Sequence, residues 1–339
     1  MLPVHPSALT RRRFLGLTAG VAAGLALAGC GGGDPAPQAA PGGAGGEEVE
    51  PMTIRTCVYA RNHASSPLFW QQFAPEGVTV EVAVITSSGE ILQAFENGSL
   101  DFGLMGAFSV LQAPNVESSG ARVIGMTARQ GVGLVGRTGV VSSVADMAGR
   151  RVAVPPPGTQ VLILNELLTR EGLVLGQDVE AVPLGYADHP AALARGDVDA
   201  YIGTEPLATQ SVVDGSGVRL PEVYSTPLGD LNTANFASGR MLERPEVCRM
   251  VARMQRDAAE HLTPGGENDP EVWRGLLVDQ FGYDEEIYDG VLENIGAEWR
   301  FDDRREAQFR GAGAALVAQG QLAQEPDYES LFAREYWDV

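Results

Sequence analysis

Lysine is absent from this 339-residue chain, and all 24 basic residues are arginine. Without lysine there is no Schiff-base catalysis by that residue and no lysine of the phosphate-binding-loop type. Basic residues are also outnumbered, because 44 acidic residues leave a net charge of -20. This deficit argues against nucleic acid as a partner, since binding to phosphates requires a basic surface.

Cysteine and histidine are also scarce. The three cysteines form no CxxC pair, and the four histidines (His5, His63, His189 and His261) show no ligand spacing. We therefore expect no zinc site, no other metal site and no bound cofactor.

The N-terminus has the features of an export signal. Residues 10–15 (TRRRFL) resemble the twin-arginine signal of bacteria, and an apolar run at 14–28 follows. The run is short for a membrane span and ends in LAGC, which resembles a lipobox. These features predict a signal peptide at 1–29 and lipidation of Cys30. The alternatives are a plain signal peptide and a membrane anchor with a chance cysteine.

Residues 30–51 are dominated by glycine, proline, alanine and glutamate, which predicts a flexible tether. Signal, lipid and tether together predict a monomeric protein anchored to the membrane outside the cytoplasm. Export permits a disulfide between Cys57 and Cys248. We expect two buried free thiols instead, because nothing in the spacing requires pairing.

The remaining chain alternates between strand and helix patterns. One unit has predicted strands at 53–59, 78–84, 101–106 and 122–126, with a helix at 90–96. A second has strands at 151–154, 179–183 and 197–202, with helices at 160–171 and 188–196. After residue 245 the pattern is helical, with one apolar face. This order indicates an α/β fold with parallel layering.

Four blocks of sequence carry a family resemblance. They are 89–103 (GEILQAFENGSLDFG), 143–154 (SVADMAGRRVAV), 191–200 (AALARGDVDA) and the Glu205-Pro206 pair. In this order they resemble the solute-binding proteins of ABC importers for nitrate, sulfonate and taurine. Each block alone is weak, but the ordered set is specific and extends over roughly 53–240.

The resemblance implies a type 2 periplasmic-binding-protein fold, in which two α/β lobes are joined by two crossing segments. We place the crossings near 133–139 and 232–238. Lobe one is then 52–137 plus 233–339 with C-terminal helices, and lobe two is 138–232. The resemblance also implies a ligand in the cleft between the lobes.

In open parallel sheets, ligands bind beyond the carboxyl ends of the strands. That rule selects a set of candidate ligand-binding residues, namely Asn62, His63, Ser87, Ser88, Gly106, Gly158, Thr159, Tyr186 and Glu205. Two of the loops open helices, where free backbone N–H groups favour an anion or a strong acceptor. Ser88 and Thr159 are equally suited to capping those helices.

Glu205 bears on the ligand's chemistry. A carboxylate in the cleft repels a bare oxyanion and suits a ligand with an N–H donor. The alternatives for Glu205 are exposure on the surface and pairing with an arginine. Arg61 and His63 either supply positive charge or face solvent, and Tyr186 either stacks on the ligand or donates to it.

The leading hypothesis is a lipid-anchored receptor that delivers a small polar organic molecule, sulfonate-like, taurine-like or nitrogen-containing, to an ABC importer permease. The second hypothesis is an enzyme on the same fold, similar to those that make thiamine pyrimidine. That class uses a cysteine cluster, which this chain lacks, and no GxSxG motif occurs. The third is a sensory ectodomain. We therefore expect no enzyme activity.

Overall fold

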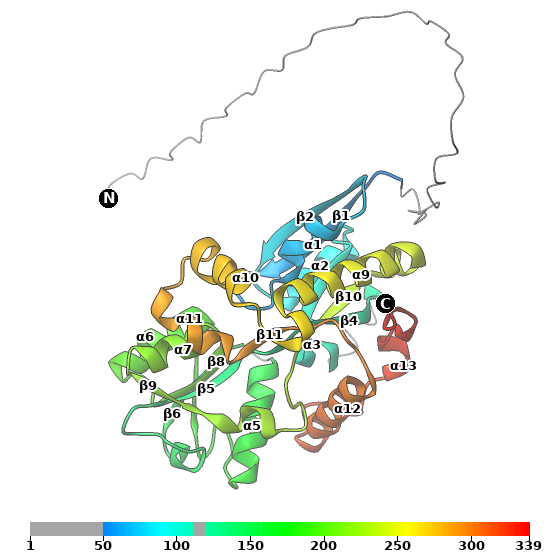
Figure 1. The fold of residues 1–339 in the computed structure, drawn as a ribbon. Helices are drawn as coiled ribbons and strands as arrows, with labels where there is room; N and C mark the ends of the chain where they lie inside the picture. The colour runs from blue at the N-terminus through cyan, green and yellow to red at the C-terminus, as the bar shows by residue number, and fades with distance from the viewer. Residues whose placement is uncertain (1–49, 112–118, 157) are drawn as a thin grey trace, which may run out of the picture. The chain divides into compact units, whose positions relative to one another are not determined.

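The computed structural model describes residues 50–111, 119–156 and 158–339. Contacts within the chain separate 48–339, the folded body, from 1–47. Cys30, the predicted signal peptide and nearly all of the predicted tether lie outside the described residues. The folded body consists of two α/β lobes (Figure 1).

Lobe one contains two sheets. In the first, β1 (Met52–Tyr59) pairs in parallel with β2 (Val78–Ile85). The second has the order β11-β4-β10-β3, with strands β11 (Ile295–Ala297), β4 (Arg122–Gln130), β10 (Leu231–Ala237) and β3 (Phe102–Gly106). The strands predicted in this half of the chain are therefore confirmed.

Lobe two contains one five-stranded sheet in the order β7-β6-β8-β5-β9. Its strands are β5 (Val132–Arg137), β6 (Arg151–Val154), β7 (Glu180–Pro183), β8 (Ala200–Thr204) and β9 (Gly217–Leu220). The predicted parallel layering holds for β6 with its neighbours β7 and β8. In contrast, β5 and β10 run antiparallel to their partners, because each enters its sheet from the other lobe rather than from a crossover helix.

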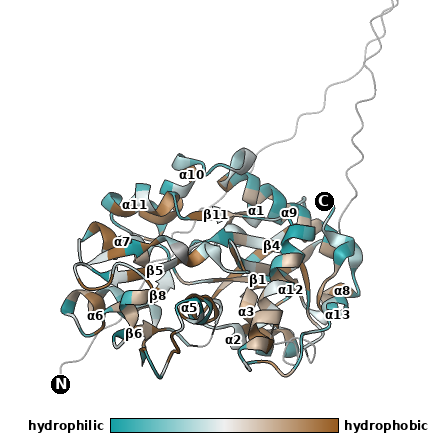
Figure 2. Ribbon diagram, turned by 90° about the horizontal axis from the view of Figure 1, so that it is seen from below, coloured by the Kyte–Doolittle hydropathy of each residue, from teal (hydrophilic) through white to brown (hydrophobic). Residues whose placement is uncertain are grey.

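Helices cover the faces of these sheets. Lobe two carries α5 (Thr159–Arg170), α6 (His189–Arg195) and α7 (Leu207–Val213). Helix α7 is brown over much of its length in Figure 2, and it packs on β5 and β9. The first half of lobe one carries α1 (Trp70–Phe73), α2 (Ser88–Glu96) and α3 (Ala107–Leu111).

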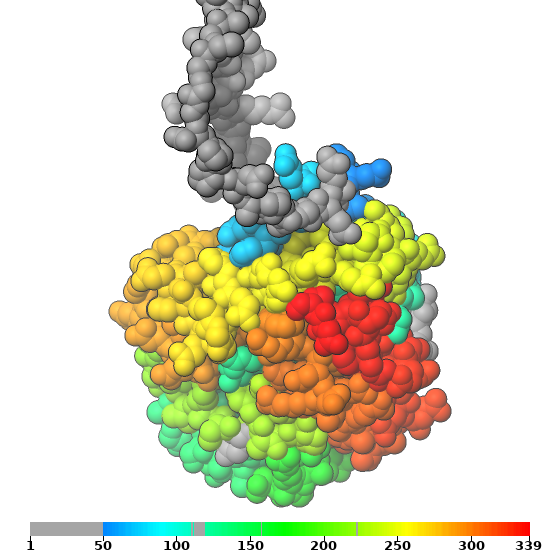
Figure 3. Space-filling view, turned by 45° about the vertical axis from the view of Figure 1, so that its right-hand side comes forward, coloured from blue at the N-terminus to red at the C-terminus, as the bar shows by residue number. Residues whose placement is uncertain are grey.

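The C-terminal part is helical, as the sequence indicated. It contains α8 (Gly239–Leu242), α9 (Pro245–Leu262), α10 (Pro270–Arg274), α11 (Glu285–Leu292), α12 (Asp303–Ala318) and α13 (Tyr328–Leu331). The predicted apolar face of α9 is buried, including Val247, Met250, Val251 and Met254. Figure 3 shows the last residues of the chain lying beside α9 on one face of the molecule.

Each lobe contains an aspartate that ties its strands together through two arginines. Asp101 accepts hydrogen bonds from Arg55 at 3.0 Å and Arg240 at 2.5 Å. In lobe two, Asp199 accepts one from the Arg137 side chain at 2.6 Å and one from the Arg151 backbone N–H at 3.1 Å. The two aspartates come from the blocks at 89–103 and 191–200, so each of these blocks supplies a carboxylate that binds arginines of its own lobe.

The first crossing lies at Gly131 rather than at 133–139. Strand β4 ends at Gln130 in lobe one, and β5 begins at Val132 in lobe two. Gly133 and Gly136 are small for a different reason. A Cβ at Gly133 would lie 2.2 Å from the Ala208 Cβ, and one at Gly136 would lie 2.2 Å from the Val141 carbonyl oxygen. These glycines allow close packing within lobe two.

The second crossing connects β9 to β10, between Leu220 and Leu231, just before the predicted 232–238. The C-terminal part also differs from the prediction, since it is not confined to lobe one. Helix α11 packs on α7 of lobe two, where the Thr209 hydroxyl donates to the Gly290 carbonyl at 3.3 Å. The two lobes are thus also connected by the packing of α11.

Candidate functional site

Residues that follow strands of the two lobes contact one another. The Asn62 side-chain amide, after β1, donates to the Thr204 hydroxyl at the end of β8 at 3.4 Å. The backbone N–H of Phe108 at the start of α3 donates to the Thr159 hydroxyl on α5 at 3.1 Å. These two contacts join lobe one to lobe two directly, and they mark the candidate site.

Two tyrosines lie in the same region, one from each lobe. Tyr59, the last residue of β1, shares a hydrogen bond of 3.0 Å with the Ser88 hydroxyl. Tyr186 donates to the Gln160 side-chain carbonyl at 2.9 Å. Burial raises the pKa of Tyr59 to about 12 and also raises the pKa of Tyr186, to which the nearby Tyr59 adds. Both phenols therefore stay protonated and serve as hydrogen-bond donors near neutral pH.

At the start of α2 and at the start of α5, the residue that caps the helix is the neighbour of the residue expected to do so. Ser87 caps α2, because its hydroxyl accepts from the Glu90 backbone N–H at 3.3 Å. That leaves the Ser88 hydroxyl to meet Tyr59. On α5 the N-cap position is Gly158, so the Thr159 hydroxyl is not a cap and reaches lobe one instead. Thr159 thus lies where the lobes meet, and Ser88 contacts Tyr59 within lobe one.

Gly106 is small because the lobes approach closely at the end of β3. A Cβ at this position would lie 3.1 Å from the Thr159 hydroxyl oxygen. This distance is tighter than ordinary van der Waals contact, so a larger residue at this position would require the Thr159 hydroxyl to shift.

His63 is buried below the site, with 2% of its surface exposed. Its ring packs on Gly131, since a Cβ at Gly131 would lie 2.0 Å from the imidazole. Burial lowers the pKa of His63 to about 4, partly offset by the Glu205 backbone. The imidazole is neutral at physiological pH and supplies no positive charge to a ligand.

Glu205 follows the second alternative considered for it, pairing with an arginine. Its side chain has no exposed surface, and its carboxylate accepts from the Arg219 guanidinium and from the Thr209 backbone N–H. Arg219 also donates to the Thr209 hydroxyl at 2.9 Å. In this structure the carboxylate is therefore engaged inside lobe two rather than presented to the cleft.

Arg61 is exposed, and its guanidinium lies 4.3 Å from the centre of the Tyr283 ring. The side-chain groups in the contacts described above are uncharged hydroxyls, amides and phenols. They come from Tyr59, Asn62, Ser88, Thr159, Gln160, Tyr186 and Thr204. A ligand at this site would be held by hydrogen bonds and by the dipoles of the helix starts.

The candidate residues selected from the sequence do not include four residues of these contacts, namely Tyr59, Phe108, Gln160 and Thr204. Tyr59 ends the predicted strand 53–59 and Gln160 begins the predicted helix 160–171, whereas Phe108 and Thr204 each lie two positions beyond a predicted strand end. The signal that could have found them is position alone, because the rule for strand ends selects both residues that flank each turn. The choice among them depends on side-chain direction, which only the folded chain fixes.

Cys57 and Cys248 are free and buried, as expected. Burial raises the pKa of Cys57 to about 11 and that of Cys248 to about 12. Neither thiol is therefore a thiolate at neutral pH. Within the part of the chain that the structure describes, no group of three or more His, Cys, Asp or Glu side chains is arranged to hold a metal ion.

A sequence profile of the NMT1-like family matches residues 70–263, more than half of the chain. The chain belongs to the NMT1-like family. The matched region of this NMT1-like chain runs from α1 to the end of α9 and includes all of lobe two. No curated protein sequence matches the chain significantly.

Solved structures share the fold at low identity. The ligand-binding component of an ABC-type import system from Staphylococcus aureus, with zinc bound, has a TM-score of 0.71 and 13% identity over 84% of this chain and 98% of that one. The alkanesulfonate-binding protein SsuA from Xanthomonas axonopodis pv. citri, bound to MOPS, has a TM-score of 0.68 and 19% identity, over 85% and 98%.

The desulfurization enzyme DSZB has a TM-score of 0.62 and 16% identity, over 84% of this chain and 97% of that one. Together these likenesses confirm the type 2 periplasmic-binding-protein fold of the NMT1-like chain. No helix in the described residues combines the length and hydrophobicity needed to cross a membrane.

Proposed function

We propose that this protein is an extracytoplasmic receptor that delivers a small polar organic ligand to an ABC importer. The ligand binds between the lobes, and closure of the lobes around it creates the surface that the permease recognises. Two of the similar structures are binding components of such systems or bind alkanesulfonates, which supports the proposal.

The observation that carries the proposal is the meeting of both lobes through uncharged polar groups. Asn62 contacts Thr204, and Phe108 contacts Thr159. These residues follow strands or begin helices, and such positions favour ligand binding. Each pair comes from opposite lobes, so a ligand inserted between them would hydrogen-bond to both and link their motion. This arrangement suits binding and release and requires no reaction on the ligand.

The ligand we propose has an acceptor-rich end, as a sulfonate has, and a second polar end. Ser88, Gly106, Gly158 and Thr159 lie at or beside the helix starts, where an acceptor-rich group is favoured. Asn62 and Gln160 offer amide groups for a donor on the ligand, the role first considered for Glu205. Tyr186 covers the ligand and donates from its phenol.

We also propose that Cys30 carries the lipid anchor and that a twin-arginine signal precedes it. The support is the order of basic residues, apolar run and LAGC in the sequence. The mature protein would then be tethered through residues 30–51 to the outer face of the cell membrane.

An enzyme on this fold is the second candidate, because DSZB shares the architecture. Cysteine nucleophiles are disfavoured in the described part of the chain, since burial raises the pKa of Cys57 and of Cys248. Turnover of a bound compound, detected as loss of the ligand over time, would favour this candidate over the receptor.

A thermal-shift screen of the purified protein tests the receptor proposal. The panel contains sulfonates, taurine-like zwitterions, nitrate, aromatic carboxylates and pyrimidines. A specific ligand at a hundredfold excess over its Kd should stabilise the fold by about 2.7 kcal/mol through mass action. Small-angle scattering with the best ligand should then show a smaller radius of gyration, and no stabilisation by any member of these classes would contradict the proposal.

A further inference from the structure

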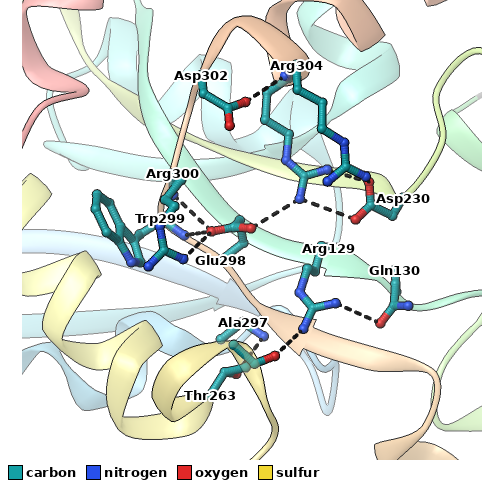
Figure 4. A network of polar contacts seen from close by, with 12 residues as sticks. Arg129, Gln130, Asp230, Thr263, Ala297, Glu298, Trp299, Arg300, Asp302 and Arg304 are labelled. Carbon is teal, nitrogen blue, oxygen red and sulfur yellow. Dashed lines mark hydrogen bonds and ion pairs between the residues drawn. The ribbon is translucent and has the colours of Figure 1, made fainter.

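A pocket of about 260 Å³ lies beside the lobe-one sheet. Figure 4 shows polar side chains from its lining and their contacts. Its lining residues come from the end of β4, the residue before β10, the last turn of α9 and the turn after it, the end of β11 and the segment after it, and the start of α12. None of the residues proposed above to bind the importer's ligand lines it. Its volume is several times the roughly 30 Å³ that one water molecule occupies.

The pocket is rich in arginine, with Arg129, Arg300, Arg304 and Arg305 in its lining. Three carboxylates are also present, those of Asp230, Glu260 and Glu298. Four positive and three negative side chains give the lining a net charge of about +1. The whole chain carries -20, so the pocket is locally positive in an acidic protein.

Pairing already accounts for the three carboxylates. Arg305, whose side chain is 4% exposed, contacts Asp230 at 2.5 Å and Glu298 at 3.1 Å. Arg304 contacts Asp230 at 3.1 Å, and Arg300 contacts Glu260 at 3.0 Å. Because Arg300 and Arg304 are more than half exposed, part of their N–H groups stay available.

Arg129 is the arginine of the pocket lining that none of these carboxylates pairs with. Its guanidinium donates to the Gly266 carbonyl at 2.8 Å and to the Gln130 side-chain carbonyl at 3.4 Å. Among the ion pairs of the described residues, none includes Arg129. A guanidinium has five N–H donors, so these two neutral acceptors leave further donors for an anion.

A glycine on the neighbouring strand makes room for this arginine. Gly296 of β11 lies opposite Arg129 in the sheet register. A Cβ at Gly296 would lie 2.8 Å from the Arg129 Nε and 2.9 Å from its Cζ. The guanidinium thus lies across β11 in a place that only glycine leaves open, which positions it before any anion binds.

We propose that this pocket is a second binding site, for a small dianionic oxyanion such as phosphate or sulfate. Arg129 is its main contact, and Arg300 and Arg304 add hydrogen bonds at the rim. Planar guanidinium groups suit this chemistry because they donate two parallel hydrogen bonds to an oxyanion. A cation is disfavoured, since the carboxylates of the pocket are already paired.

The pocket also lies next to both crossings. Arg129 is two residues before Gly131, and Asp230 immediately precedes β10. An oxyanion there would join the lobe-one ends of both crossings and change the free energy of lobe closure. This step rests on the proposed function, and linkage then requires ligand and oxyanion to change each other's affinity by the same factor.

Calorimetric titration of the full chain in detergent, with phosphate or sulfate at constant ionic strength in chloride, tests the site. We expect saturable binding of one oxyanion per chain. Arg129→Gln should weaken binding at least tenfold, and Gly296→Ala should weaken it by displacing the same guanidinium. Arg195→Gln, which removes an exposed arginine outside the pocket, is the matched control and should leave the affinity unchanged.

Absence of saturable binding would overturn the proposal. So would an affinity that Arg129→Gln leaves intact in a variant with an unchanged Tm. If Thr159→Val abolishes the binding and Arg129→Gln does not, the oxyanion occupies the cleft instead. Because no importer ligand is used, a failure here is distinguishable from a failure of the proposed receptor function.

Discussion

The Glu205 carboxylate is fully buried against the Arg219 guanidinium, 14 residues further along the chain. The pair is completed by Thr209, which donates to Glu205 from its backbone N–H and accepts from Arg219 through its hydroxyl. Burial raises the pKa of Glu205, while the adjacent Arg219 opposes that rise. This network fixes the start of α7 to β9 and so belongs to the framework of lobe two.

The first prediction follows from that network. Glu205→Ala should lower the free energy of unfolding by about 3–5 kcal/mol, because Arg219 is left without its partner in a largely buried place. Urea unfolding of the purified protein measures the change. Asp197→Ala, which removes an exposed pair with Arg195, should change stability by less than about 1 kcal/mol. If the Glu205→Ala variant keeps full stability but binds the ligand more weakly, Glu205 contacts the ligand and this prediction is wrong.

Acid should destabilise the protein through His63. The pKa of His63 is about 4 in the folded chain, below its ordinary value of 6.5, so the unfolded chain binds the proton more readily. Its contribution to stability is complete above pH 6.5 and is lost as pH falls toward 4, by about 3 kcal/mol in total. The lowered pKa of buried His189 acts in the same direction.

Urea midpoints between pH 7 and pH 4 test this. The His63→Gln variant should lose less stability between pH 7 and pH 4 than the parent chain loses. His261→Gln is the control, since His261 lies on the outer part of α9 against Phe69 and Phe73. An equal pH dependence in the His63 variant and the parent would refute the role of His63.

The first crossing should not tolerate a side chain. Gly131 has a φ of 79°, which disfavours other residues, and a Cβ there would overlap the His63 ring. Gly131→Ala should therefore lower the Tm, and adding His63→Ala should restore part of the loss by removing the overlap. Gly139 also has a positive φ, but a Cβ there would have no atom within 4 Å. The Gly139→Ala variant therefore measures the backbone effect alone. Equal losses for both glycines would show that His63 contributes nothing.

The best ligand from the screen should depend on hydroxyls of lobe two. Thr159→Val and Tyr186→Phe should each weaken binding by about 1 kcal/mol, or roughly fivefold, because each removes one neutral hydrogen-bonding group. Calorimetry measures the affinities. Thr138→Val is a control from lobe two, since its hydroxyl bonds to the Gly215 carbonyl instead. Unchanged affinity in both cleft variants would place the ligand elsewhere.

Cys30→Ala should release the protein from membranes if Cys30 carries the lipid. Fractionation of cells that express the variant, with detection of the folded body, gives the answer. Cys57→Ala is the matched control, because that thiol is buried in the fold. A Cys30→Ala protein that stays in the membrane unprocessed would favour an uncleaved anchor.

The sequence by itself determined strands β1 to β4 and β6 to β8, helices α2, α5 and α6, and the two-lobed fold, but it did not identify strands β5, β9, β10 and β11. The predicted strand at 78–84 lies within β2, and the predicted helix at 90–96 lies within α2. These features are local, because periodicity and turn chemistry depend on neighbours along the chain. The ordered blocks added the topology that local patterns do not contain.

Only the tertiary structure decided where the chain passes from one sheet to the other and which of the candidate polar residues have partners inside a lobe. Gly133 and Gly136 look like hinge residues in the sequence, yet they are small because Ala208 and Val141 pack against them. Glu205 and His63 follow strands in the way ligand contacts do, yet one pairs with Arg219 and the other packs on Gly131. The physical reason is that side-chain partners distant in sequence decide whether a polar group is buried or presented, and nothing local encodes those partners.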